Sequence, residues 1–188
     1  LHLELGDFSR AQKLARPIVE TRKLSCSEIP HLTFARMAAP CLAHGLAENA
    51  AEYHARGYSL VRNNPEFVEP VGQHMSYLAA AGKPAEGLKL IERHLPWLAI
   101  SGSTVRHYRF FCGTRAVLAS AIAKGLKDSR KLRLPKSLPI YRESGEYSLS
   151  ALLKWADAEL DGLTKQLDTR NGNNFYAAQV AALRASTP

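Results

Sequence analysis

A glycine that opens an amphipathic segment, with a small residue five positions later, occurs three times in the first half of this chain. The copies begin at Gly6, Gly45 and Gly82, so their spacings are 39 and 37 residues. Their small residues are Ala11, Ala50 and Gly87. A period in this range is typical of stacked helical hairpins, in which each unit buries its apolar face against its neighbours. The period therefore predicts an array of helix pairs, and such arrays usually hold other proteins and carry out no chemistry.

Apolar side chains recur at steps of three and four along most of the sequence, which indicates helices. Helices are expected over residues 8–24, 30–44, 47–63, 66–81, 83–98, 103–126, 148–170 and 174–185. Pro40 should bend or split its helix, and Pro96 should end or kink its own, because proline removes a backbone donor. No segment alternates as a half-buried strand would, so the predicted fold class is all-α.

Three parts of the chain differ in pattern. Residues 1–126 contain the glycine-led hairpins. Residues 127–147 combine prolines with many basic residues and show no helical stripe, so a long irregular connection is expected there. Residues 148–188 return to a helical stripe, interrupted by a turn at Gly172, and should shield the exposed end of the array. We expect the three parts to form one continuous globular unit.

Composition excludes the membrane and disordered classes. Hydrophobic residues make up 46% of the 188 positions and charged residues 22%. The three cysteines (Cys26, Cys41 and Cys112) are odd in number and widely spaced, which favours the reducing cytoplasm over a disulfide framework. The sequence starts at Leu1, and residues 1–5 resemble the last turn of a helix, so we expect a fragment of a longer protein.

The second half of the tetratricopeptide repeat has a glycine at the hairpin turn, an aromatic residue soon after it, and then a small residue. Gly6, Phe8 and Ala11 resemble this signature, and the two later copies keep it less completely. The segment 167–173 is also similar to one in bacterial tetratricopeptide proteins of unassigned function.

This resemblance covers about residues 1–100. It implies a right-handed α-solenoid of tetratricopeptide-like hairpins, closed by a C-terminal helical cap. HEAT-like and unclassified solenoids stay as alternatives, because the period here exceeds the family's repeat length of about 34 residues.

A tetratricopeptide-like array implies a concave groove lined by the first helix of each hairpin. Positions that face the groove recur nine or ten residues before each turn glycine, which selects Arg36, Gln73 and, if Gly125 ends a further such helix, Arg115. Guanidinium groups pair with carboxylates, so this row is expected to meet the acidic groups of a bound peptide, with Tyr77 adding flat contact area. The alternative is that these are ordinary solvated or helix-pairing residues.

The net charge of +8 is unevenly placed, since residues 106–136 hold nine Lys or Arg residues and one acid, Asp128. The predicted basic patch consists of Arg106, Arg109, Lys124, Lys127, Arg130, Lys131, Arg133 and Lys136. Clustered positive charge with aromatic rings nearby is typical of nucleic-acid-binding surfaces. No RNA or DNA motif accompanies it, so a solvated basic face or a surface for an acidic neighbouring domain is equally compatible.

No motif for catalysis or for cofactor binding is found in the sequence: HExxH, GxSxG and a phosphate-binding glycine loop are all missing. Cys41 and His44 lie one helical turn apart, but structural zinc normally takes four ligands, and no second pair follows at ligand spacing. We therefore predict no catalytic residue, no metal and no cofactor.

These observations together predict a non-catalytic interaction module within a larger bacterial, regulatory protein. Its expected partner is a protein or peptide of acidic character, or another domain of the same chain. A nucleic-acid-associated helical domain that uses residues 106–136 is the alternative. No membrane partner is expected.

Overall fold

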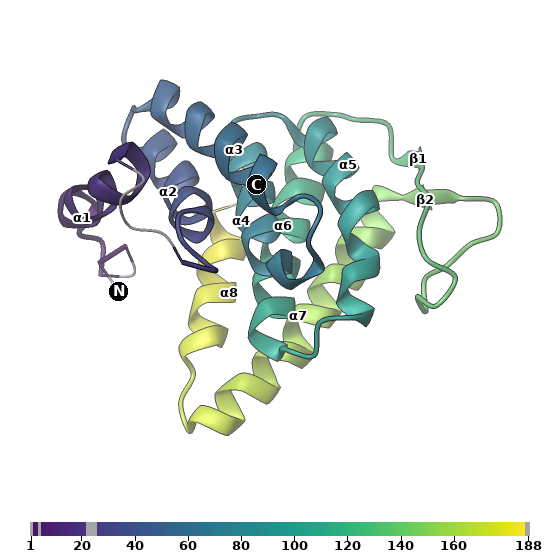
Figure 1. The fold of residues 1–188 in the computed structure, drawn as a ribbon. Helices are drawn as coiled ribbons and strands as arrows, with labels where there is room; N and C mark the ends of the chain where they lie inside the picture. Colours follow the sequence, from purple (N-terminus) through teal and green to yellow (C-terminus); the bar gives the residue numbers. More distant parts are fainter. Residues whose placement is uncertain (1, 4, 22–25, 187–188) are drawn as a thin grey trace.

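The computed structural model describes residues 2–3, 5–21 and 26–186, and most of them are helical (Figure 1). The helices are α1 (Phe8–Thr21), α2 (His31–Ala43), α3 (Ala47–Val61), α4 (Val68–Ala80), α5 (Pro84–His94), α6 (Thr104–Ala123), α7 (Leu149–Asn171) and α8 (Phe175–Ala185). Short 3-10 segments, η1 (Pro65–Phe67) and η2 (Leu95–Ala99), precede α4 and follow α5. The predicted all-α class is confirmed. α5 ends two residues before Pro96, whereas α2 runs through Pro40 to its end and is not split there.

The prediction that no strand occurs is wrong for two short segments. β1 (Ser129–Lys131) and β2 (Glu146–Ser148) pair in antiparallel register and join the two ends of the connection between α6 and α7. Tyr147 in β2 and Leu132 just after β1 are buried, so this connection packs against the helices. Strands of three residues are too short for an alternating pattern to identify them in the sequence.

The repeated glycines form the same structure each time. Gly45, Gly82 and Gly125 follow α2, α4 and α6, and each has a φ near +70°. At each turn the glycine N–H donates to the carbonyl three residues back, and the next N–H donates to the carbonyl five residues before it. This left-handed helix end favours glycine, which has no Cβ to clash. The sequence repeat therefore marks one recurring helix C-terminal turn.

Gly6 belongs to the same set. Its φ is +74°, its N–H donates to the Leu3 carbonyl at 3.2 Å, and the Asp7 N–H donates to the His2 carbonyl at 2.9 Å. These are the two bonds seen at the other three turns. Of the predicted last helical turn over residues 1–5, residues 1 and 4 lie outside the described residues.

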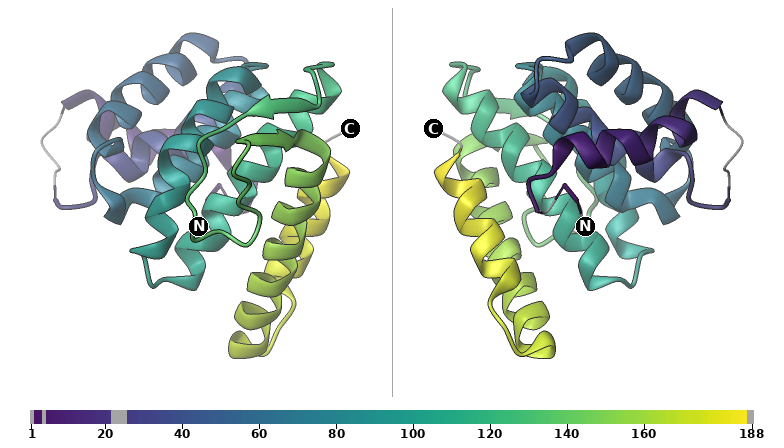
Figure 2. Two further views of the ribbon diagram at one scale, coloured as in Figure 1. Left: turned by 90° about the vertical axis from the view of Figure 1, so that its right-hand side faces the viewer. Right: turned by 90° about the vertical axis from the view of Figure 1, so that its left-hand side faces the viewer.

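Helix α4 occupies the centre of the molecule. It packs between α2 and α6, and its contact with α6 is the most extensive between any two described elements. α3 packs on α2, α5 on α4 and α7 on α6, so α2, α4 and α6 form a row of adjacent helices, each with a second helix packed on it. The α7–α8 hairpin projects beyond the rest of the molecule (Figure 1), and α1 and α8 lie on the same side (Figure 2, right).

Candidate binding groove

A hollow of about 480 Å³ lies where α1 faces the row of helices α2, α4 and α6. Most of its lining is apolar and comes from α1 and α2, including Leu14, Ile18 and Met37. Leu14 is 56% exposed, a high value for a leucine that points into a concave surface. Its polar edge carries Arg36, Gln73 and Arg109, and none of the described residues that line it is an acid.

A second hollow, of about 370 Å³, lies between α4, α6 and α8. Small side chains line it, among them Ala79, Ala116 and Ser120, together with Leu183 of α8. Ser76 lines both hollows, so they meet on α4. We call the two hollows together the groove: its floor is α2, α4 and α6, α1 is one wall and α8 is the other.

Arg36 and Gln73 come from different helices and meet at one carboxylate. Arg36 Nη2 lies 3.1 Å from Glu69 Oε1, and Gln73 Nε2 donates to the same oxygen at 3.3 Å. The Arg36 side chain is 55% exposed, whereas that of Glu69 is 16% exposed. The carboxylate therefore holds both side chains in place and leaves much of the guanidinium open to a ligand. Among the described residues, nothing donates to the buried Gln73 Oε1.

The structure places Arg115 and Tyr77 in the interior and not on the groove surface. Arg115 Nε donates to Asp157 Oδ1 of α7 at 3.0 Å, and its side chain is 9% exposed because α7 and α8 cover it. Tyr77 is 4% exposed, and its ring stacks on His54 of α3 with the ring centres 4.8 Å apart. Counting back from a turn glycine finds the helix, but it cannot show what covers that helix.

Arg109 contributes to the groove in place of Arg115. The sequence analysis assigned it to the basic patch, yet its side chain lines the hollow beside Gln73. Its guanidinium carbon lies 5.7 Å from the ring centre of Tyr108, and its Nη1 lies 3.4 Å from Gln179 Oε1 of α8. Arg109 lies six positions before Arg115 on α6, so a fixed offset from Gly125 misses it.

The predicted basic patch does not form one surface. Arg106 lies in the first turn of α6 and Lys124 directly follows its last residue, which separates them by roughly 27 Å along the helix axis. Arg106 pairs with Glu66 at 2.8 Å, and Lys124 Nζ donates to the Gly82 carbonyl at 2.8 Å. Farther along, Lys127 and Lys136 are exposed and Arg130 is half-buried.

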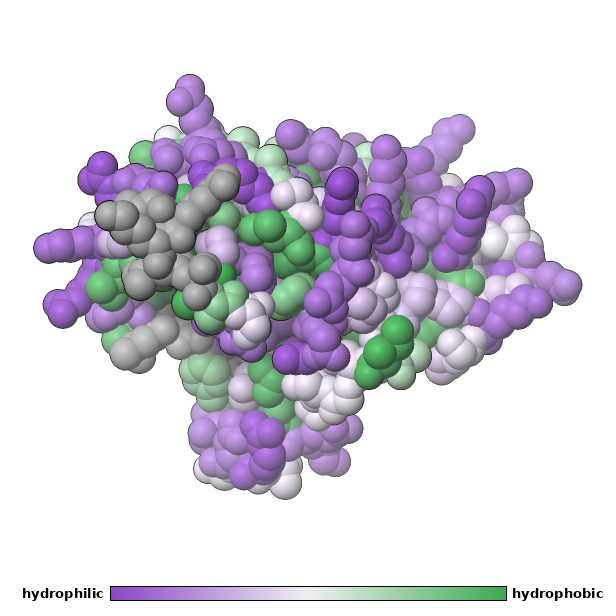
Figure 3. All heavy atoms as spheres, viewed as in Figure 1, coloured by the Kyte–Doolittle hydropathy of each residue, from purple (hydrophilic) through white to green (hydrophobic). Residues whose placement is uncertain are grey.

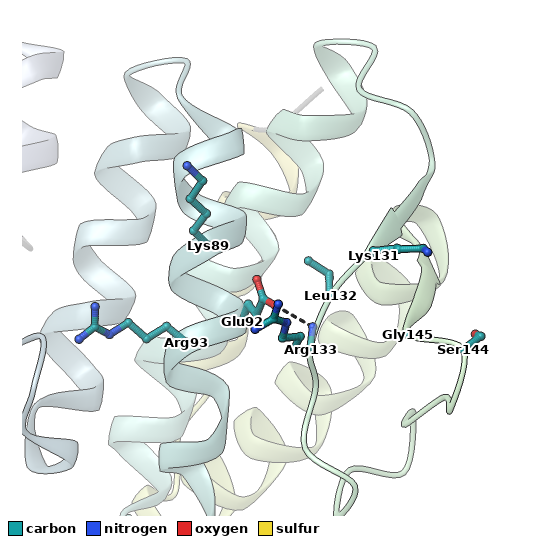
Figure 4. A pocket seen from close by; sticks show the side chains of 8 residues that line it. All are labelled: Lys89, Glu92, Arg93, Lys131, Leu132, Arg133, Ser144 and Gly145. Carbon is teal, nitrogen blue, oxygen red and sulfur yellow. Dashed lines mark hydrogen bonds between the residues drawn. The ribbon is translucent and has the colours of Figure 1, made fainter.

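Two members of the patch line a separate cleft of about 770 Å³, between α5 and the segments beside β1 and β2 (Figure 4). Lys131 and Arg133 come from one side of it, and Lys89 and Arg93 come from α5 on the other side. Figure 4 shows that both α5 side chains point away from Lys131, and Arg93 Nη2 donates to Asn63 Oδ1 at 2.8 Å.

The carboxylate of Glu92 also lies in this cleft and accepts the Arg133 N–H at 2.8 Å. The cations of the cleft therefore do not converge on a common point. The sequence analysis did not assign the α5 cations to any site, because they lie outside residues 106–136 and only the fold brings them near Lys131.

A cluster of histidine and aromatic side chains fills the space between α3, α4 and α5. His54 Nδ1 lies 3.3 Å from His74 Nδ1, and the Tyr58 hydroxyl lies 2.9 Å from His94 Nε2. His74 and His94 are fully buried. Burial lowers the pKa of His74 to about 3 and the pKa values of His54 and His94 to about 4. All three rings are therefore neutral at pH 7.

The cluster was not found from the sequence because its histidines come from three helices without a spacing motif. Within residues 2–3, 5–21 and 26–186, no group of three or more His, Cys, Asp or Glu side chains is arranged to hold a metal ion.

In the same part of the chain, no helix is both long and apolar enough to cross a membrane. Hydrophilic side chains cover most of the face seen in Figure 3, and hydrophobic ones form small separate areas on it.

Comparison with protein-family models, with curated proteins and with solved structures finds no match to this chain.

Proposed function

We propose that this chain is a tetratricopeptide-like solenoid whose groove binds an amphipathic partner helix that carries acidic residues, without catalysis. The hollow between α1 and the row of α2, α4 and α6 carries this proposal. Its walls are apolar, Arg36 and Arg109 lie along its polar edge, and no acid is found among its described lining residues. A helix with one apolar face and carboxylates beside that face complements such a surface in both hydropathy and charge.

The repeated turns support the solenoid part of the proposal. Four glycines in left-handed conformation carry the same pair of backbone hydrogen bonds, and three of them end the adjacent helices α2, α4 and α6. Stacks of this kind present the first helix of each pair along one surface. The groove floor consists of those three helices.

We also propose the cytoplasm as the location of this chain. Cys26, Cys41 and Cys112 are all free thiols, and Cys26 is exposed. Exposed free thiols are common in a reducing compartment.

The test is a binding assay with two synthetic amphipathic peptides that differ only in having glutamate or lysine beside the apolar face. We expect the glutamate peptide to bind more tightly. Replacing Arg36 and Arg109 with glutamine should weaken its binding by roughly a hundredfold or more, because each charge-assisted contact contributes about 1.5–3 kcal/mol. Fluorescence anisotropy measures both affinities.

Arg62→Gln is the matched control, because Arg62 is exposed at the end of α3 and does not line the groove. It removes one positive charge and should leave the affinity unchanged. Equal binding of the two peptides, or an unchanged affinity in the double variant, would contradict the proposal.

The nucleic-acid alternative has less support, because the cations of residues 106–136 lie in separate places. The cations that line the cleft between α5 and β1 point in different directions. Its test is the binding of a single-stranded oligonucleotide at low salt. Binding that falls steeply with salt and disappears in the Lys131→Gln, Arg133→Gln double variant would favour it over the groove.

A further inference from the structure

A third hollow, of about 470 Å³, lies at the N-terminal ends of α2, α4 and α6. Arg36 lines both this hollow and the one beside α1, so the two meet at that side chain. Ser76 in turn lines both the hollow beside α1 and the hollow beside α8. The three hollows therefore follow one another over the floor helices, and we call them together the extended groove.

One face of α4 and one face of α6 line the extended groove. The lining residues of α4 run from Glu69 to Ala80 at steps of one and three. Those of α6 recur at steps of one, three, four and seven. They are Val105, Arg106, Arg109, Ala116, Ser120 and Ala123. Because steps of this kind keep side chains on one side of a helix, the extended groove is a single surface that follows both helices.

Polar contacts at both ends hold α4 and α6 side by side. At their N-terminal ends Arg106 pairs with Glu66, just before α4, at 2.8 Å. At their C-terminal ends the Ser120 hydroxyl donates to the Ala79 carbonyl at 3.2 Å. The surface over these two helices is therefore continuous from their first turns to their last.

The length of this surface determines the length of helix that fits on it. Val105 lines the hollow at one end of the extended groove, and Ala123 lines the hollow at the other. A helix rises about 1.5 Å per residue, so these two residues lie roughly 27 Å apart along α6. A partner helix that fills the extended groove therefore needs about 18 residues.

Acidic side chains line the extended groove at one end only. Glu28, Glu66 and Glu69 line the third hollow, whereas no acid is found among the described residues that line the other two. Glu66 and Glu69 each pair with an arginine, but Glu28 is exposed and forms no ion pair with any described residue. Lys124 lines the opposite end. The extended groove therefore has an excess negative charge at Glu28 and positive charge from Arg109 to Lys124.

We propose that the extended groove binds one long amphipathic helix with a fixed order of charges. A basic residue at one end of the partner lies over Glu28, and the acidic residues that follow it lie beside Arg36, Arg109 and Lys124. This proposal rests on the proposed function, to which it adds the length of the partner and the order of its charges. Complementary charges along an interface fix the register of the partner and disfavour the wrong one. In the alternative, a shorter helix fills only the hollow beside α1.

The first experiment tests the length of the partner with two labelled peptides, whose affinities are measured by fluorescence anisotropy. The long peptide has about 18 residues, with a lysine at one end and glutamates beside its apolar face. The short peptide keeps the lysine and the first glutamates but lacks the last two turns. Ala123→Glu places a negative charge at the far end of the extended groove, at an exposed position. It should weaken binding of the long peptide by about threefold or more and leave that of the short peptide unchanged.

Ala158→Glu is the matched control, because Ala158 is exposed on α7 and lines none of the three hollows. It adds the same charge to the chain and should change neither affinity. An equal effect of Ala123→Glu on both peptides, or no effect on either, would show that no single helix occupies the whole extended groove.

The second experiment tests the order of charges with a double-mutant cycle at low salt. Replacing the terminal lysine of the long peptide with glutamine should weaken its binding to the unchanged chain by about threefold, the modest effect of an exposed ion pair. The same replacement should have no effect on binding to the Glu28→Gln chain. Glu48→Gln is the control, since Glu48 is exposed on α3 and lines none of the three hollows, and there the threefold loss should remain.

The outcomes separate the extended groove from the proposed function. If the long and the short peptide bind equally well and the lysine has the same effect with and without Glu28, only the extended groove is overturned. If neither peptide binds any form of the chain, the proposed function fails as well.

Discussion

Replacing Gly113 with alanine is expected to abolish or severely weaken folding. A Cβ atom at this position of α6 would collide with the carbonyl oxygen of Gly72 on α4 and would lie 3.0 Å from its Cα. A Cβ at residue 72 would in turn lie 2.6 Å from the Cα of Phe110. Backbone atoms cannot rotate out of the way as side chains do. The helices would have to separate along the most extensive contact in the described structure, at an expected cost of more than about 3 kcal/mol.

Urea unfolding measures this loss, and Gly162→Ala supplies the control. Gly162 is exposed in the interior of α7, and apart from its two neighbours and the adjacent backbone of α7, no atom lies within 4 Å of where its Cβ would be. Alanine there should raise the free energy of unfolding by about 0.5–1 kcal/mol, because it favours the helix more than glycine does. A Gly113→Ala chain as stable as the unchanged protein would mean that α4 and α6 do not cross at backbone contact.

Lowering the pH from 7 to 4 is expected to unfold the protein steeply. An unfolded histidine takes up its proton near pH 6.5, whereas His74 and His94 keep pKa values of about 3 and about 4 in the folded chain because burial disfavours their charged forms. Between these limits the unfolded state binds more protons than the folded state, so stability falls as the pH falls. The two buried rings together cost about 3 kcal/mol for each pH unit below 6.5.

His94→Gln tests this origin, because glutamine does not titrate and can still bond to the Tyr58 hydroxyl. The free energy of unfolding, measured in urea at several pH values between 7 and 4, should then fall less steeply, by about 1.4 kcal/mol per pH unit. His44→Gln, at the exposed end of α2, is the comparison for losing a histidine outside the cluster. An identical slope in His94→Gln and the unchanged chain would assign the acid sensitivity to other groups.

The sequence predicted most helices because their signals are local. Apolar periodicity and the turn glycines depend on neighbouring residues alone, and the glycines after α2, α4 and α6 do form helix C-terminal turns. The pairing of β1 with β2 was missed, since it joins residues 129–131 to 146–148 across an irregular loop. The length of these strands gave no pattern to detect.

The candidate site was predictable only in part, for a related reason. Arg36 and Gln73 were selected by their offset from a turn glycine, and they do lie together at the groove. Arg115 satisfies the same rule but is covered by α7 and α8, which come from a part of the chain that the repeat does not describe. The histidine cluster and the cleft between α5 and β1 both depend on which elements are adjacent in the fold. A single sequence carries no direct signal for such adjacency.

The direct backbone contact between α4 and α6 also determines which parts of the groove can yield. At the crossing of Gly72 and Gly113 no side chain lies between the two helices to rearrange, so the floor is stiff there. α1 packs mainly on α2, and α8 packs mainly on α7, so each wall is attached along one side and is compliant. We therefore expect the groove to accept partner helices with side chains of different size, because its walls can move. Selectivity would then depend on the charges fixed at its floor.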